Sequence, residues 1–172
     1  KDYWTHLREM GLDKTQQSLH DLSLSWVNSN RPSQVSKMVK NKKFNTASQF
    51  TLWCLLKSNG FRVPEGGGYF SFNRAEKFDL EEFKHDTDRI ITLWRGGTGK
   101  YSADYDLGRP WASFTLIKNR ANTFAKYHGT HASNALRLDK NSGSHWIVEL
   151  QCKLSDVKLY IDAGGDEEVI IG

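Results

Sequence analysis

The N-terminal part of the chain has hydrophobic residues at helical spacing. Between residues 3 and 58 they recur every three or four positions, as in Leu19, Leu22 and Trp26. This period places an apolar stripe on each of three or four short amphipathic helices. The expected helix breaks are Gly11, residues 30–32 and Asn45, and the expected N-caps are Ser33 and Thr46.

The rest of the chain has the pattern of β-strands. A glycine-rich turn at residues 64–68 ends the helical pattern, and short segments rich in β-branched and aromatic residues follow. The expected strands are residues 69–72, 89–94, 111–115, 146–152, 157–161 and 168–171. Helices are expected over residues 79–84 and 117–127, the second with Ala121, Phe124 and Ala125 on its inner face. The pattern predicts an α+β fold with mainly antiparallel strands, as one domain over residues 1–172 with a helical part (1–60) and a strand-rich part (61–172).

The composition is that of a folded, soluble domain. A length of 172 residues suits one hydrophobic core, and a 12% aromatic content supplies large apolar side chains to fill it. No run approaches the roughly 18–20 apolar residues of a membrane span, so no membrane partner is expected. Cys54 and Cys152 lie far apart in apolar segments. Free thiols explain them best, although the sequence is also compatible with one disulfide.

The charge balance is slightly basic. The chain has 24 Lys and Arg against 20 Asp and Glu, a net charge of +4, which weakly favours an acidic or nucleic-acid partner. Much of the excess lies in a lysine cluster formed by Lys37, Lys40, Lys42 and Lys43. A solvated helix face is the more common origin of such a cluster, and a phosphate-contacting patch is the alternative.

Two segments in the strand-rich part differ in chemical type from their neighbours. Arg95 ends an apolar expected strand and precedes Gly96. Its rigid guanidinium suits bidentate phosphate binding, and a glycine lets a ligand approach the backbone. Ser113 and Thr115 alternate along the next strand, so their hydroxyls share one face. Each segment alone also has a simpler explanation: a strand-end arginine in water, and a Thr115 that caps the following helix.

An acidic pair precedes the last expected strand. Asp166 and Glu168 lie two residues apart and share one face at the start of an apolar segment. Placing a carboxylate at the edge of a sheet costs desolvation free energy unless it meets a cation or a ligand. In isolation, an acidic turn at a strand start is the simpler explanation.

Two further patterns are rejected as sites. Residues 96–100 look like a phosphate loop, but that motif requires glycine where Trp94 stands and Ser or Thr where Tyr101 stands. His128 and His131 have a spacing suited to a metal, but no further His or Cys cluster completes a site. No metal is therefore expected.

In this chain order, the arginine, serine-x-threonine and acid-x-glutamate segments resemble the motifs of the arginine–serine–glutamate class of mono-ADP-ribosyltransferases, the cholera-toxin-like class. The surrounding residues agree over 93–96, 111–115, 119–125, 159–162 and 166–171. The resemblance covers about residues 89–171 and does not extend to residues 1–85. It implies an N-terminal helical cap followed by the split antiparallel β-sheet core of the ADP-ribosyltransferase fold, with NAD⁺ as co-substrate.

The resemblance also implies a reaction and residue roles. Such enzymes cleave the nicotinamide–ribose bond of NAD⁺ and transfer ADP-ribose to a macromolecule. Nicotinamide is cationic in NAD⁺ and departs neutral, so one carboxylate suffices to stabilise the oxocarbenium ion. In this chain Glu168 would supply it, Ser113 would orient Glu168, and Asp166 would position or deprotonate the acceptor. The positions expected to contact NAD⁺ are Arg95, Gly96, Ser113, Thr115 and Phe124.

Asp166 departs from the family pattern, which has Glu where arginine side chains are modified and often Gln where asparagine or a nucleobase is the acceptor. The acceptor therefore stays open between a protein arginine and an RNA or DNA base. The family context implies a toxin or effector, either cytoplasmic or delivered into the cytoplasm of a target cell, with an antitoxin or immunity protein as a further partner. The alternatives are a plain NAD glycohydrolase and a non-catalytic binding module with the same fold.

Overall fold

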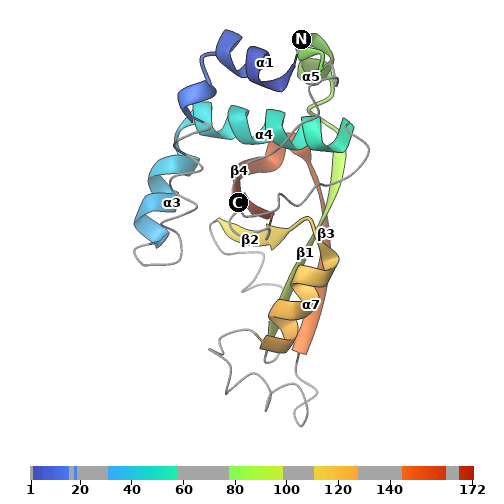
Figure 1. The fold of residues 1–172 in the computed structure, drawn as a ribbon. Helices are drawn as coiled ribbons and strands as arrows, with labels where there is room; N and C mark the ends of the chain where they lie inside the picture. Colours follow the sequence, from blue (N-terminus) through green and yellow to red (C-terminus); the bar gives the residue numbers. More distant parts are fainter. Residues whose placement is uncertain are drawn as a thin grey trace.

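The computed structural model describes residues 2–15, 18, 31–57, 78–98, 111–127, 145–161 and 167–172. Its helices are α1 (Tyr3–Glu9), α3 (Arg31–Val39), α4 (Lys42–Lys57), α5 (Leu80–His85) and α7 (Lys118–Tyr127). Its strands are β1 (Ile90–Thr98), β2 (Ala112–Thr115), β3 (His145–Lys153), β4 (Val157–Ile161) and β5 (Glu168–Ile171). Helix α4 crosses over β4 with α1 and α5 beyond it, and α7 lies along the ribbon of β1 and β3 (Figure 1). The expected α+β class is confirmed.

The five strands of the described residues form one antiparallel sheet in the order β3-β1-β2-β5-β4. Strand β1 pairs with β3 along its whole length, from Ile90 opposite Lys153 to Thr98 opposite His145. Between the described parts of β1 and β2, by contrast, the register consists of the pair Trp94 and Thr115. The sheet therefore has two halves, β3-β1 and β2-β5-β4, which meet at a narrow junction.

The expected strands match the observed ones except at their ends and at residues 69–72, which lie outside the described residues. One correction concerns Arg95, which lies inside β1 rather than at its end, because the strand continues to Thr98. Gly97 makes this continuation possible: a Cβ atom at this position would lie 2.2 Å from Cζ2 of Trp146. The indole ring thus occupies the space above the glycine, and the ribbon needs glycine there.

The expected N-caps and one expected helix break are wrong. Ser33 and Thr46 lie inside α3 and α4, and Asn45 lies within α4 rather than at a break. Helix α4 begins earlier because Oδ1 of Asn41 accepts a hydrogen bond from the backbone N–H of Lys43 (2.9 Å). The N–H groups of the first helical turn have no partner within the helix, and Asn41 supplies one for Lys43. None of the described helices is long and apolar enough to cross a membrane.

Helix α4 covers the outer edge of β4. Nε2 of Gln49 donates to the backbone oxygens of Val157 (3.0 Å) and Ser155 (3.2 Å), and Oγ of Ser48 accepts from the backbone N–H of Tyr160 (2.8 Å). An outer strand has backbone groups without a partner in the sheet, and these side chains supply partners for some of them. The helical part is therefore joined to the sheet by specific polar contacts as well as by apolar packing.

Aromatic side chains fill the core between α1, α4 and α5. The Tyr3 ring stacks on Phe50 with centroids 5.8 Å apart, and Phe83 meets Phe50 edge-on at 5.2 Å. Trp53 is fully buried, and its Nε1 donates to Oδ2 of Asp86 (2.9 Å). The expectation that the aromatic residues build a core is confirmed for this cluster.

Both cysteines are free, as expected, but their environments differ. Cys54 is buried in α4, whereas Cys152 is partly exposed on β3. Burial raises the pKa of the Cys152 thiol to about 11, and the nearby Asp156 carboxylate adds to the shift. At neutral pH this thiol is therefore protonated and a weak nucleophile.

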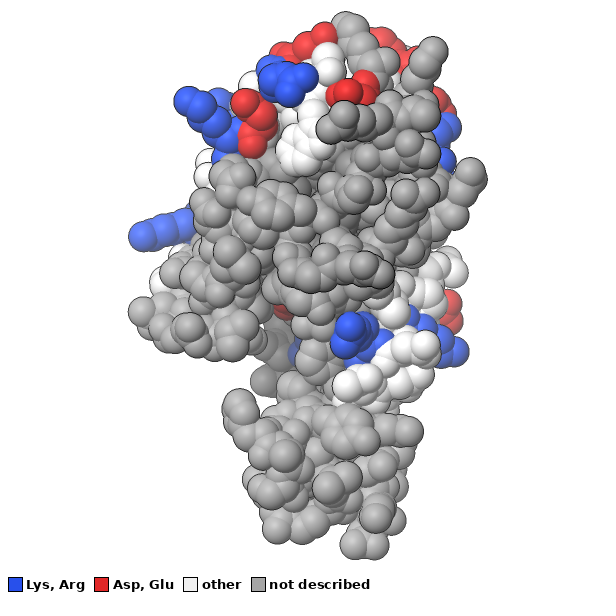
Figure 2. All heavy atoms as spheres, in the orientation of Figure 1, with Lys and Arg blue, Asp and Glu red and all other residues white. Residues whose placement is uncertain are grey.

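Charged side chains of both signs lie next to one another at the top of the face shown in Figure 2. Among the described residues, Lys57 forms an ion pair with Glu82, and Lys84 with Glu81 (2.8 Å). The lysine cluster differs from these pairs: all four of its side chains are exposed, and none forms an ion pair with an acid among the described residues.

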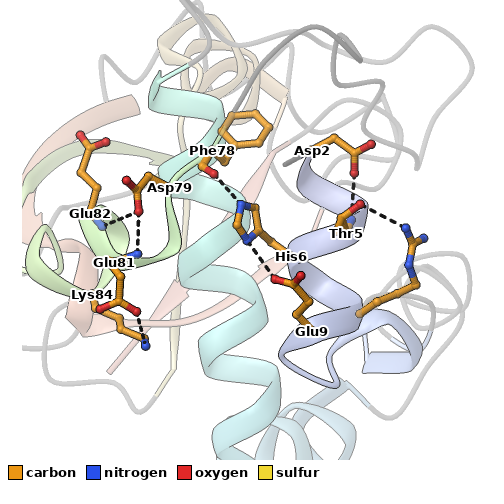
Figure 3. A network of polar contacts seen from close by, with 10 residues as sticks. Asp2, Thr5, His6, Glu9, Phe78, Asp79, Glu81, Glu82 and Lys84 are labelled. Atoms are coloured by element: carbon orange, nitrogen blue, oxygen red, sulfur yellow. Dashed lines mark hydrogen bonds and ion pairs between the residues drawn. The ribbon is translucent and has the colours of Figure 1, made fainter.

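Polar contacts tie α1 to the start of α5 (Figure 3). Nε2 of the buried His6 contacts the carbonyl oxygen of Phe78, and because a carbonyl accepts, Nε2 is the donor. Asp2 caps α1 through the N–H of Thr5 (2.8 Å), and Asp79 caps α5. These contacts fix the two helix ends on either side of the aromatic core.

Candidate active site

Ser113 lies on β2, between β1 and β5 in the sheet. Its neighbours Ala112 and Phe114 are buried, with 3% and 2% exposure, while Ser113 is half-buried. Because alternate residues of a strand face opposite sides, Phe114 packs into the core and Ser113 shares the other face with Thr115. The apolar residues of β2 thus fix the strand, and its hydroxyl side chains lie together.

The Ser113 hydroxyl donates a hydrogen bond to Oε1 of Glu168 on β5. The strand register places Thr115 directly opposite Glu168 and Ser113 opposite Ile170, so the contact runs diagonally between strands. A hydrogen bond to an ionised carboxylate is stronger than one between neutral groups. It fixes the orientation of the Glu168 carboxylate.

Arg95 reaches the same strand from β1. Its Nη1 donates to the backbone carbonyl oxygen of Ser113 at 2.7 Å, and the side chain is half-buried. A guanidinium carries its N–H donors in a rigid fork, so a contact of this kind orients the whole group. The planar fork is the side chain best matched to phosphate oxygens.

Ser113 is the common element of this site. Its backbone carbonyl holds the cation and its hydroxyl holds the carboxylate, although Arg95 and Glu168 are 18 and 55 positions away along the chain. The structure thus brings Arg95, Ser113 and Glu168 together across three adjacent strands. A guanidinium can bind an anionic group of a ligand, and a carboxylate can accept a hydrogen bond from a ligand or stabilise a developing positive charge.

The structure gives less information on the other expected site residues. Thr115 is buried, and its Oγ1 accepts a hydrogen bond from the N–H of Ile117 (3.1 Å), so the hydroxyl shapes the turn into α7. Its contact with NAD⁺ stays a prediction. Gly96 lies within β1 opposite Ile147. Phe124 belongs to α7, but its side chain lies outside the described part of the structure, as does the whole of Asp166.

Glu167 is a notable residue that the sequence patterns did not single out. It is fully buried and has a positive φ of 44° immediately before Glu168. Alternation along the strand places the acids at positions 166 and 168 on one face, so the sequence pattern points to those two residues. The only signal at position 167 is a third acid beside an apolar strand, and glutamate itself gives no indication of a left-handed backbone.

No protein-family model matches this chain, and comparisons with curated proteins and with solved structures give no match. Among the residues that the structure describes, no group of three or more His, Cys, Asp and Glu side chains is arranged to hold a metal ion. The contacts of Ser113 with Arg95 and with Glu168 are therefore the observations that bear on function.

Proposed function

We propose that this protein is an enzyme that cleaves the glycosidic bond of a dinucleotide, and more specifically an NAD⁺-dependent mono-ADP-ribosyltransferase of the arginine–serine–glutamate class. The observation that carries this proposal is the contact of Ser113 with both Arg95 and Glu168. These are the three residues in which the sequence resembles the motifs of that class. Their meeting on adjacent strands supports the resemblance with geometry that the sequence does not contain.

The proposed chemistry assigns one task to each group. Arg95 binds the pyrophosphate or the adjacent ribose of NAD⁺ through its guanidinium fork. Glu168 accepts a hydrogen bond from the nicotinamide ribose and stabilises the positive charge that develops as nicotinamide leaves. Ser113 keeps Glu168 in the required orientation. Nicotinamide departs as a neutral base, so this step needs no general acid.

The sheet supports the corresponding fold assignment. We assign the α+β domain to the ADP-ribosyltransferase fold, whose core is a split antiparallel sheet. The narrow junction between β3-β1 and β2-β5-β4 agrees with such a split. The expected catalytic groups lie on β1 and β2, which form the junction, and on β5 next to β2.

The proposed acceptor is a macromolecule, either a protein arginine or an RNA or DNA base. Exposed lysines at positions 37, 40, 42 and 43 and the net charge of +4 favour an anionic acceptor surface, which nucleic acid would supply. As part of this proposal the protein acts as a toxin or effector in a cytoplasm, and an antitoxin or immunity protein is a further partner.

The test uses NAD⁺ labelled on its adenylate group, incubated with the protein and a cell lysate. We expect a labelled macromolecule with the wild-type protein and none with Glu168→Gln, while Glu149→Gln on β3 serves as a matched control. Label that survives protease but not nuclease identifies nucleic acid as the acceptor, and the converse identifies protein. Free ADP-ribose without any labelled macromolecule would assign the glycohydrolase activity instead. Unchanged NAD⁺ in every lysate would contradict the enzymatic proposal.

A further inference from the structure

Glu167 combines two features that are unfavourable for a glutamate. Its φ of 44° lies in the left-handed region, where the Cβ atom of an L-residue is crowded, and the other described non-glycine residue with a positive φ is Trp111. Its side chain is also fully buried, and burying a carboxyl group is costly unless hydrogen bonds or charges compensate. Among the described acidic residues, Glu167 is the one in the buried class.

Such a conformation persists when the surrounding structure determines it, and it is frequent beside functional groups. The backbone oxygen of Glu167 accepts a hydrogen bond from the N–H of Leu116 (3.3 Å), one step beyond the registered pair of Thr115 and Glu168. The residue is therefore held twice, by its backbone against the end of β2 and by its side chain in the interior.

The left-handed turn at Glu167 sets the direction in which β5 starts. The next residue, Glu168, points to the face that carries Ser113 and forms the hydrogen bond with its hydroxyl. A change in φ and ψ at position 167 would rotate the first residue of β5 relative to β2, because backbone rotations act on the residues that follow directly. The orientation of the Glu168 carboxylate thus depends on the conformation of the residue before it.

We infer that Glu167 is a positioning residue: its buried side chain keeps the backbone left-handed, and this conformation directs the Glu168 carboxylate to the Ser113 hydroxyl. The effect of Glu167 on kcat rests on the proposed transferase function. Its effect on the orientation of the Glu168 carboxylate does not. This role depends on the shape of the Glu167 side chain rather than on its charge, so an uncharged side chain of equal shape should serve as well.

The test compares three substitutions. Glu167→Gln keeps the shape and should retain kcat within about threefold, whereas Glu167→Gly permits the left-handed backbone but removes the anchor. We expect Glu167→Gly to lower kcat roughly 100-fold, the order of loss that a misplacement of about 1 Å causes, with KM for NAD⁺ nearly unchanged. Glu149→Gly on β3 is the control for placing a glycine in this sheet. Should Glu167→Gly fail to fold, Glu167→Asn replaces it, because Asn tolerates the left-handed region and is one methylene shorter.

A second readout needs no activity. With ¹³C-labelled glutamate, the Glu168 carboxyl signal is assigned by its loss in Glu168→Gln, and Ser113→Ala shows where it moves without the hydroxyl. We expect Glu167→Gly to move the signal in the same direction and Glu149→Gly to leave it in place. A moved signal in a protein that never consumes NAD⁺ would support the positioning role and overturn the proposed function. If Glu167→Gly leaves both the Glu168 signal and kcat at their wild-type values, the positioning role is overturned. It is also overturned if Glu167→Gln lowers kcat as much as Glu168→Gln does.

Discussion

Replacing Ser113 by alanine removes the hydroxyl that holds Glu168 while leaving the strand and the backbone carbonyl that binds Arg95 intact. A hydrogen bond to a charged group contributes about 1.5–3 kcal/mol. Both side chains are half-buried, so water competes for the carboxylate and the lower part of this range applies. At 1.36 kcal/mol per factor of ten, kcat should fall about 10- to 50-fold. KM for NAD⁺ should change little, since the hydroxyl acts through Glu168 on the transition state.

The assay is the initial rate of nicotinamide release at a series of NAD⁺ concentrations. Thr123→Ala is the matched control, because it removes an exposed hydroxyl whose hydrogen bond, to the Asn119 carbonyl (3.0 Å), stays within α7. Since Ser113 is proposed to act through Glu168, the double variant Ser113→Ala/Glu168→Gln should be no slower than Glu168→Gln alone. A Ser113→Ala protein with kcat within twofold of wild type, or a full additional loss in the double variant, would refute the assignment of Ser113 as the residue that orients Glu168.

Arg95→Lys keeps the charge but loses the planar fork, so KM for NAD⁺ should rise roughly tenfold in steady-state kinetics; an unchanged KM would remove Arg95 from the NAD⁺ site. Phe50→Ala empties a fully buried position in the aromatic core and should lower the free energy of unfolding by about 3–5 kcal/mol in urea titrations, and a loss below about 1 kcal/mol would contradict the packing described. Gly97→Ala places a methyl group where the Trp146 ring lies, so it should cost about 1–3 kcal/mol and change the tryptophan fluorescence; a silent variant would show that the ring moves freely. Burial raises the pKa of Cys152 to about 11, so in a Cys54→Ala background its alkylation rate should keep rising with pH past 9, where an ordinary thiol would level off, and a plateau near 9 would refute this environment.

The elements of this fold were predictable where the chain has a clear hydrophobic period. The strands at residues 157–161 and 168–171 agree with the observed β4 and β5, because both are short apolar segments bounded by turn formers. Helix starts were less predictable. Thr46 was expected to cap α4, but Asn41 caps it, and the local composition suits either residue for this role. The extension of β1 beyond Arg95 depends on pairing with β3, where the ring of Trp146 covers Gly97. The pattern of residues along one strand does not show which strand it pairs with.

In the candidate site, too, local patterns predicted some features, whereas others depend on the tertiary structure. Alternation along β2 predicted that Ser113 and Thr115 share a face, and the register confirms that both lie on the side of Glu168. That Ser113 contacts Arg95 through its carbonyl and Glu168 through its hydroxyl depends on strand order, which no local pattern encodes. The buried, left-handed Glu167 was missed because both properties arise from tertiary packing rather than from the preference of glutamate.

The side chains of Ser48 and Gln49 make the strand-rich part dependent on the helices that precede it. Without α4, the backbone oxygens of Ser155 and Val157 and the N–H of Tyr160 would face solvent along the rim of the sheet. Unpaired backbone groups along the edge of a sheet can pair with strands of other molecules, which leads to aggregation. Residues 61–172 expressed alone should therefore form insoluble assemblies, and residues 31–57 must be retained in any fragment made to study the reaction.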